Sequence, residues 1–372
     1  MIPLIDRYII KEWLKAMGVA LLLIVGILVL EDMYKYLKTF IDKGASLATL
    51  LTYYAFVIPS CLHTVLPIAF LISILYVLNE MQTHHEVIAL RAAGLTVFRI
   101  TRSFWFIAVA LVFGMVVFNI SVLPYSADRV QSIMRLIDYN EQKKNHANVN
   151  AIGMEYNLNF YNAKARRLWF MRNFSWYTYR GSYATVCSFN ASNQEVSRIE
   201  AKEVRFDDSR REWIFNEGKH WSFDLERGIP SGFVNFKEYV LQCEDAPRLM
   251  QVIHKPIKNL TINELKLILD FVPRGHERFL EHQVQYYSIL SSPLICFIVV
   301  LLAIPFSLVG VRNNTMVGIA KAVGLFFCYY ILSSLGRLLG AQGFLSPLMA
   351  TWLPNFSMLF IGIYLYRQLA PR

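Results

Sequence analysis

The stretch THHEVIALRAAG, Thr83–Gly94, lies between two long apolar segments and belongs to neither. Thr83 and Glu86 have the spacing of a capping box, in which a hydroxyl and a carboxylate satisfy free backbone amides at a helix start. Arg91 falls in the last turn, where the helix dipole favours a cation, and Gly94 is a typical C-terminal stop. The sequence predicts a short helix over 83–94 that cannot span a membrane.

The segments on either side are long and apolar enough to do so, since a span needs about 20 mostly apolar residues. Six segments meet this requirement: Trp13–Leu30, Tyr54–Leu78, Phe104–Leu123, Ile289–Val309, Met316–Leu335 and Pro347–Tyr366. The chain of 372 residues is 55% hydrophobic and 17% charged, which is too apolar for an ordinary soluble protein. We expect a membrane α-helical bundle of six transmembrane helices.

The net charge of +10 is unevenly distributed. Positions 124–282 hold 23 basic and 20 acidic residues, which leaves 14 and 7 for the rest of the chain. The excess therefore flanks the apolar segments and does not form the basic face of a nucleic-acid binder. One side of the bundle carries nine Lys and Arg residues in its short connections, and the other side carries four. The positive-inside rule places the first side, with both termini, in the cytoplasm.

The polar middle of the chain alternates as β-strands do. In EVRFD, Val204 and Phe206 fall on one face, and EWIF brings Trp213 and Phe215 after a polar turn. Several short alternating runs of this kind predict an inserted all-β domain on the outer side of the membrane, with an antiparallel sandwich or jelly-roll-like fold. Cys187 and Cys243 lie in this part and would form a disulfide or remain free thiols; no metal-binding cysteine spacing is present.

The segment TINELKLILDF follows the β region. Thr261 and Glu264 form a second capping-box pattern, and apolar residues recur on one face, which predicts an amphipathic connector. The predicted organisation is helices one to three with the 83–94 helix in 1–123, the β domain in 124–259, the connector in 260–282 and helices four to six in 283–372.

Three interpretations of the 83–94 helix remain open. It is an interfacial helix without a partner, a metalloprotease helix, or a coupling helix docked into a cytoplasmic motor. HEVIA supplies the His and Glu of HExxH, but Ala89 occupies the second ligand position, which weakens the protease interpretation. The coupling helix accounts for the capped ends and the apolar middle together.

The chain resembles the LptF/LptG permeases, the membrane subunits of the lipopolysaccharide export ABC transporter. The motifs that carry the resemblance are IDRYI (Ile5–Ile9), HEVIALRAAG, VSRIEAKEVRFDDSRREWIFNEG (Val196–Gly218), LTINELKLIL and SPLICFIVVLLAIPFSLVGVRNN (Ser292–Asn314). IDRYI and the Lys-bearing segment after the first span are more similar to the LptG branch. The chain departs from the family in YYSILSSP, where a Lys often precedes the proline of span four.

The resemblance implies a set of partners. These are a second permease of the same family, a cytoplasmic ABC ATPase dimer, a periplasmic bridge protein of the LptC/LptA type and lipopolysaccharide. Glu86 matches the acidic residue of the coupling helix that meets the ATPase, with Val87, Leu90 and Arg91 beside it. The chain has no GxxxxGK[ST], so we expect ATP and Mg on the partner, and neither a cofactor nor catalysis on this chain.

The resemblance also suggests sites for the lipid. Lys35, Lys38 and Lys43 lie beyond the first span on the outer side, where they would bind headgroup phosphates or merely snorkel beside acidic neighbours. Small residues in span five allow a close helix approach, either at a lateral gate or in ordinary packing within one subunit: Gly318, Ala322 and Gly324. Aromatic residues of the β domain would line a groove for the acyl chains: Phe206, Trp213 and Phe215.

The expected location is the cell inner membrane. The main alternative function is an ABC-type membrane subunit that transmits force to a periplasmic partner without moving lipid. A membrane-anchored scaffold or a membrane enzyme are the other classes, but no catalytic triad or paired carboxylates stand out in the sequence.

Overall fold

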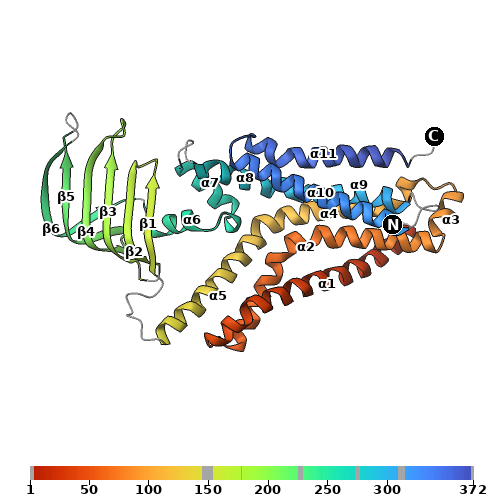
Figure 1. Ribbon diagram of the computed structural model, residues 1–372, viewed down its shortest axis with the longest axis horizontal. Helices are drawn as coiled ribbons and strands as arrows, with labels where there is room; N and C mark the ends of the chain where they lie inside the picture. The colour runs from red at the N-terminus through yellow and green to blue at the C-terminus, as the bar shows by residue number, and fades with distance from the viewer. Residues whose placement is uncertain are drawn as a thin grey trace. The chain divides into compact units, whose positions relative to one another are not determined.

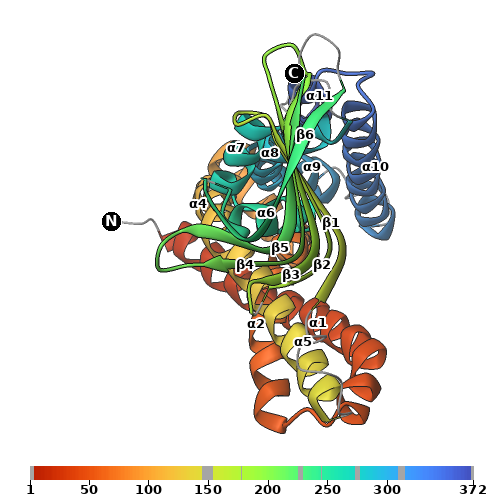
Figure 2. The same ribbon diagram turned by 90° about the vertical axis from the view of Figure 1, so that its left-hand side faces the viewer.

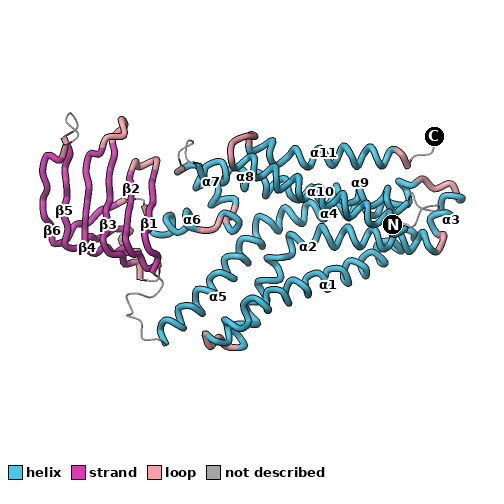
Figure 3. The backbone as a smooth tube through the Cα atoms, viewed as in Figure 1, coloured by secondary structure: helices cyan, strands magenta, loops and turns pink. Residues whose placement is uncertain are grey.

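The computed structural model describes residues 4–144, 154–176, 178–224, 229–243, 245–272, 277–308 and 315–369. The chain divides into two compact units. The first contains Met1–Gln131 and Leu280–Arg372, and the second contains Ser132–Phe279. Figure 3 shows that the strands all belong to the second unit and that the first is helical.

The first unit is a helical bundle, and its described residues include six helices long and apolar enough to cross a membrane, which confirms the predicted spans. Its elements in chain order are α1 (Leu4–Asp42), α2 (Leu47–Thr83), α3 (Glu86–Ala92), α4 (Val97–Val117), η1 (Phe118–Val122), the start of α5 (Leu123–Lys144), the end of α8 (Glu277–Ser291), η4 (Ser292–Leu294), α9 (Ile295–Leu308), α10 (Thr315–Ala341) and α11 (Pro347–Arg367). Figure 1 shows α3 as the short element between α2 and α4.

The first helices are longer than the predicted spans. α1 has 39 residues, or about 58 Å at 1.5 Å per residue, which exceeds the roughly 30 Å of a bilayer core. α2 continues through Pro59 and Pro67, which the neighbouring helices of the bundle tolerate. The ends of both helices therefore project beyond the apolar layer.

The third span continues without a break into a polar helix. A single turn of π-helix, η1, joins α4 to α5, and α5 runs to Lys144. The expectation that β structure begins near residue 124 is wrong for this segment. Ile133 and Ile137 are buried and four residues apart, so one face of α5 is apolar, as in an amphipathic helix.

The core of the bundle forms around α9. Nearly every residue of this helix is buried, and α2, α4, α10 and α11 all pack against it. In a membrane such a helix is shielded from lipid by its neighbours, whereas the outward faces of α1 and α10 keep large apolar side chains exposed. This is the arrangement expected of a lipid-embedded bundle.

The second unit contains one antiparallel sheet. Its strands are β1 (Met154–Asn162), β2 (Arg167–Ser175), β3 (Arg180–Phe189), β4 (Glu195–Asp207), β5 (Glu212–Phe223) and β6 (Pro230–Gln242). Each strand pairs with the next in the chain, so the order is β1-β2-β3-β4-β5-β6. The inserted all-β domain is confirmed, but its described strands form a single meander, whereas a jelly roll divides its strands between two sheets.

The sheet has one apolar face, covered by a helix of the same unit. Figure 2 shows the strong twist of its strands. After β6 the chain forms α6 (Pro247–His254), whose Met250 is fully buried among the residues of that face. A 3₁₀ turn, η3 (Ile257–Asn259), then leads to α7 (Ile262–Phe271). The capping box predicted for α7 is present, because Thr261 and Glu264 each accept the other's backbone N–H.

Candidate functional sites

The short helix α3 begins differently from the sequence prediction. Thr83 is the last residue of α2, and its hydroxyl donates a hydrogen bond to the carbonyl of Asn79. The residue before α3 is His85, whose φ of 59° turns the chain sharply and whose side chain makes no capping hydrogen bond. The predicted Thr83–Glu86 capping box is therefore wrong, and the two helices are separated only by this tight turn.

The end of α3 agrees with the prediction. Gly94 has a φ of 86°, a conformation that favours glycine, and its N–H donates to the carbonyl of Arg91. The N–H of Leu95 donates to the carbonyl of Leu90, which completes a Schellman motif. Helix α3 is thus held at a fixed length by local geometry at both ends.

The two faces of α3 have different surroundings. Val87 is 3% exposed within the core of the bundle, and Leu90 packs partly against the same core. Ile88, at 41%, faces outward together with Ala89 and Arg91. Of the residues predicted to couple to an ATPase, Val87 and Leu90 therefore anchor the helix, whereas Glu86 and Arg91 remain accessible.

Glu86 has a partner on α1. The hydroxyl of Tyr8 donates a hydrogen bond of 3.1 Å to Glu86 Oε1. Two positions earlier, Asp6 is 4% exposed and contacts α4. Its Oδ2 accepts from Arg99 at 3.3 Å and from Arg102 at 2.5 Å, and its Oδ1 accepts from the hydroxyl of Ser103 at 2.9 Å. These contacts were not predicted from the sequence, although an acid in the first turn of an apolar helix was an available signal for those of Asp6.

The three lysines beyond the first span differ in their surroundings. Lys35 Nζ lies 2.6 Å from Glu31 Oε1 one turn earlier, so this ammonium already has a counter-ion within the chain. Lys38 is exposed, and among the described residues it forms no ion pair. Lys43 lies in the turn that ends α1, and its N–H donates to the carbonyl of Thr39. Between Lys35 and Lys38, Lys38 is therefore the lysine more available to an external anion.

The small residues of α10 also separate into two kinds. At Gly318 an added Cβ would lie 2.4 Å from the carbonyl oxygen of Phe306, and Ala322 is fully buried. Both therefore serve packing within this chain. At Gly324 an added Cβ would meet no atom within 4 Å, so only this member of the predicted set lies on an open face.

A second small-residue pair on α10 was missed by the sequence analysis. A Cβ at Gly336 would lie 2.4 Å from the carbonyl oxygen of Ala350, and one at Gly340 would lie 2.5 Å from the Ala350 Cβ. The two glycines are four residues apart, which is the small-xxx-small spacing. This pair lets α10 and α11 cross closely.

The aromatic residues predicted to line a groove lie in a closed core. Trp213 and Phe215 are 0% exposed and Phe206 is 9% exposed, and all three belong to the cluster under α6. Trp169 packs against Trp213 with ring centroids 4.8 Å apart. In this conformation the chain's own residues occupy the surface that a lipid would need.

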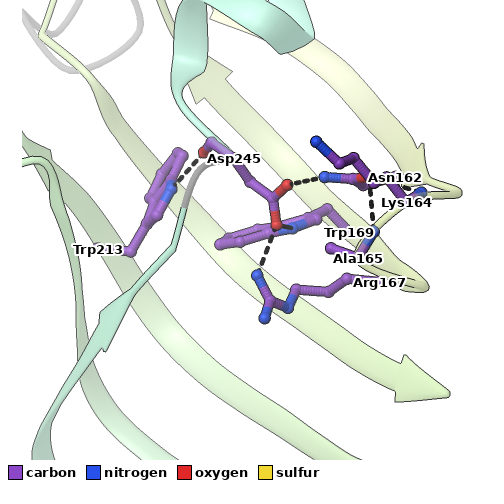
Figure 4. Close-up of polar contacts among 7 residues, drawn as sticks. All are labelled: Asn162, Lys164, Ala165, Arg167, Trp169, Trp213 and Asp245. Carbon is purple, nitrogen blue, oxygen red and sulfur yellow. Dashed lines mark hydrogen bonds and ion pairs between the residues drawn. The ribbon is translucent and has the colours of Figure 1, made fainter. Parts of the chain in front are cut away.

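Asp245 fastens this closure (Figure 4). It is fully buried and follows β6, and its carboxylate accepts hydrogen bonds from Asn162 at 2.5 Å, Arg167 at 2.8 Å and the indole of Trp169 at 2.9 Å. The indole of Trp213 donates to its main-chain oxygen at 2.6 Å. Buried charge persists only when it is paired in this way, so Asp245 ties the segment before α6 to β1, β2 and β5.

The two cysteines of this unit are free thiols, so the disulfide alternative is not realised. Cys187 lies in β3 and Cys243 follows β6. Burial raises the pKa of each thiol to about 11, and for Cys187 the neighbouring Glu195 adds to this effect. Both are therefore weak nucleophiles at neutral pH.

Comparison with known proteins identifies the family. The sequence profile described as "Lipopolysaccharide export system permease LptF/LptG" matches residues 7–368. The chain belongs to the LptF/LptG family. The match covers nearly the whole chain, both units included, and does not distinguish the LptF branch from the LptG branch. A search of curated proteins found no match.

Membership of the LptF/LptG family agrees with the architecture described above. A multi-pass inner-membrane permease needs apolar spans, and the described part of the chain contains six candidates. The motifs IDRYI and HEVIALRAAG meet in space through Tyr8 and Glu86, although 78 positions separate the two residues in the sequence. An LptF/LptG chain is a permease of lipopolysaccharide export.

Proposed function

We propose that this chain is the permease subunit of an ABC transporter that extracts lipopolysaccharide from the inner membrane and passes it to a periplasmic bridge. The observation that carries the proposal is the placement of α3. This short helix is fixed at both ends and anchored by Val87. Its outer face, at one end of the bundle, combines the charged Arg91 with the exposed apolar side chain of Ile88. Such a face requires a partner in water, and the family supplies the kind of partner.

Orientation follows from the basic residues. Arg91, Arg99 and Arg102 gather around α3, whereas Lys35 and Lys38 lie at the opposite end of α1. The positive-inside rule then puts α3 and both termini in the cytoplasm and the β domain in the periplasm. In this orientation α3 meets a cytoplasmic ATPase.

The ATPase is proposed to dock on the outer face of α3. Glu86 would accept a basic residue of the ATPase, and Ile88 and Arg91 would complete the contact. Because the chain contains no GxxxxGK[ST], the ATP and Mg are assigned to the partner. A second permease of the same family would complete the transmembrane part, with one ATPase under each; we place this chain in the LptG branch on the motifs of its first helix.

The outer end of α1 is proposed to hold the lipid headgroup. Lipopolysaccharide carries phosphates on its lipid A, and an ammonium group without an internal partner attracts them most strongly. Lys38 has this property, and Lys35 shares its charge with Glu31. Gly324, on the open face of α10, is the residue of the predicted gate that remains available to the partner permease.

The β domain is proposed to keep the acyl chains out of water. Removing one chain of about 14 carbons from the bilayer costs about 11 kcal/mol, at about 0.8 kcal/mol per CH₂. Several chains must therefore be buried again as they leave, and an apolar sheet face offers the surface. Phe206, Trp213 and Phe215 would contribute to it once the segment around α6 moves away, and a bridge protein of the LptC/LptA type would continue the path.

Copurification tests the proposal. The tagged chain, expressed in its native host, should copurify with an ABC ATPase and a second permease. The purified complex should also contain lipid A phosphate. An ATPase without lipid would favour the alternative function, in which the subunit transmits force to a periplasmic partner and moves no lipid. Recovery of the chain without any ATPase would refute both.

A further inference from the structure

The start of α1 is held on two sides. Asp6 binds α4 through Arg99 and Arg102, and Tyr8 binds α3 through Glu86. We call these five residues the N-terminal clamp. Successive residues of an α-helix are about 100° apart around its axis, so Asp6 and Tyr8 point in nearly opposite directions. The start of α1 is therefore bonded to α3 on one side and to α4 on the other.

The buried half of the clamp is the set of contacts between Asp6 and α4. Asp6 is 4% exposed and has three hydrogen-bond donors around it, two of them charged. Arg102 has a buried Nε without a hydrogen-bond partner in the described chain, and its guanidinium lies 5.9 Å from the centre of the Phe106 ring. Losing Asp6 would leave two guanidinium groups partly buried and unpaired, which is unfavourable. The contact thus fixes one position of α1 against α4.

α1 itself is suited to transmit movement. It is a single helix of 39 residues without an internal proline, whereas α2 contains two and α9 contains one. A continuous helix moves as a rod, because bends occur at prolines, π-bulges or interrupted hydrogen bonds. The clamp lies at one end of this rod, and Lys35 and Lys38 lie near the other.

We propose that Tyr8 and Asp6 are positioning residues that pass the movement of α3 to α1 and so to its headgroup-binding end, Tyr8 directly through Glu86 and Asp6 through α4, the helix that follows α3. This inference rests on the proposed function. It assigns to the N-terminal motif a role in coupling that is separate from ATPase docking. In this proposal α1 acts as a lever: its first turns contact α3 and α4, and its far end carries the lysines that bind the lipid headgroup.

The test uses the complete transporter, purified with its partner permease and ATPase and reconstituted in liposomes that contain lipopolysaccharide. Asp6→Asn removes the charge of the buried half of the clamp, and Tyr8→Phe removes only the hydroxyl of a residue that is 42% exposed. Glu12→Gln is the matched control, since Glu12 is a carboxylate of the same helix whose ion pair, with Lys15, stays within α1.

The quantity to measure is lipopolysaccharide extracted per ATP hydrolysed. Asp6→Asn should lower this ratio about tenfold and Tyr8→Phe about fivefold, as expected for loss of a charged and a neutral hydrogen bond that couple two sites. Both variants should keep the ATPase bound and active, and Glu12→Gln should match the wild type. A merely structural defect would lower the amount of assembled complex and leave the ratio unchanged.

A distance measurement follows the lever itself. Spin labels at Y34C and F344C report on the outer end of α1 and on the turn after α10, and both native side chains are highly exposed. The ATP-dependent change in this distance should be present in the wild type and lost in Asp6→Asn and Tyr8→Phe. Wild-type ratios in both variants, or loss of the ATPase from both, would overturn the lever. Absence of extraction by the wild type would instead refute the proposed function.

Discussion

The indole nitrogen of Trp213 donates a hydrogen bond of 2.6 Å to the main-chain oxygen of Asp245. This contact joins β5 to the segment that carries α6 over the apolar face of the sheet. The aromatic face is thus sealed by a single short segment with one buried carboxylate at its start. The stability of this seal can be measured.

Asp245→Asn should destabilise the seal by about 3 kcal/mol, because it leaves Arg167 without its buried counter-charge. Hydrogen exchange of the full-length protein in detergent should show faster exchange in β1, β2 and α6 and little change in α9. Asp208→Asn, in the exposed turn between β4 and β5, is the control. Equal protection of the two variants would show that the carboxylate does not hold the segment.

Glu86→Lys should weaken ATPase docking at least tenfold, since reversing one member of an interfacial charge pair costs about 2 kcal/mol or more. The permease pair itself should remain assembled, because Val87 and not Glu86 fills the core of the bundle. The ATPase recovered with the tagged permease gives the measurement, and Glu12→Lys gives the control. Normal lipopolysaccharide export by cells that carry only Glu86→Lys would contradict the docking role.

Lys38→Glu should reduce the lipid A phosphate that copurifies with the transporter more than Lys35→Glu does. The reason is that Lys35 already lies 2.6 Å from Glu31, whereas Lys38 has no ion pair in the described chain. ATPase binding should be unchanged in both variants. If both retain wild-type lipid, the lysines only anchor the helix at the membrane surface.

Acid should loosen the α6–α7 connection at Glu264. Burial disfavours the charged form, but the backbone N–H of Thr261 and the ammonium of Lys255 outweigh it and hold the pKa of Glu264 below its usual value. A lowered folded-state pKa adds stability above the unfolded pKa of about 4.3, and this contribution is lost as the pH falls through the folded-state pKa. The protection factors of the α7 amides, which compare observed with intrinsic exchange rates, should therefore fall below about pH 4. Glu264→Gln should remove most of this pH dependence. An unchanged profile in Glu264→Gln would assign it to another group.

Gly336→Leu should lower the melting temperature of the chain itself, because its side chain would collide with the Ala350 carbonyl. Overpacking of this kind costs about 1–3 kcal/mol. Gly324→Leu should leave the melting temperature of the isolated chain unchanged and weaken its association with the second permease. If Gly324→Leu associates normally, the gate does not include this face.

The sequence predicted what depends on local pattern and missed what depends on distant contacts. Thr83 and Thr261 have the same spacing to a glutamate, yet only Thr261 forms a capping box, because α2 continues through Thr83 and uses its hydroxyl internally. The alternation around Phe206 indicated a strand but not how many sheets the strands would form, since alternation marks the buried face of a strand and does not say which strands pair.

The candidate sites show the same division. The composition of 83–94 located α3 and its stop at Gly94, but it did not indicate which of its apolar residues would face the bundle. The partnership of Tyr8 with Glu86 has no local signal at all, because it depends on the packing of α1 beside α3. The segment 123–144 was assigned to the β domain although Ile133 and Ile137 mark a helical face, so that error was avoidable.

Among the described strands of the meander, β1 and β6 each pair with a neighbour on one side only. Unsatisfied backbone groups along such a border recruit any extended chain that arrives first, including a copy of themselves. A cell that makes this subunit in excess of its partner subunits should therefore accumulate oligomers in which the edge strands of separate copies pair. Matched synthesis of the partner subunits is then a condition for preventing aggregation of this subunit, independently of any transport that it performs.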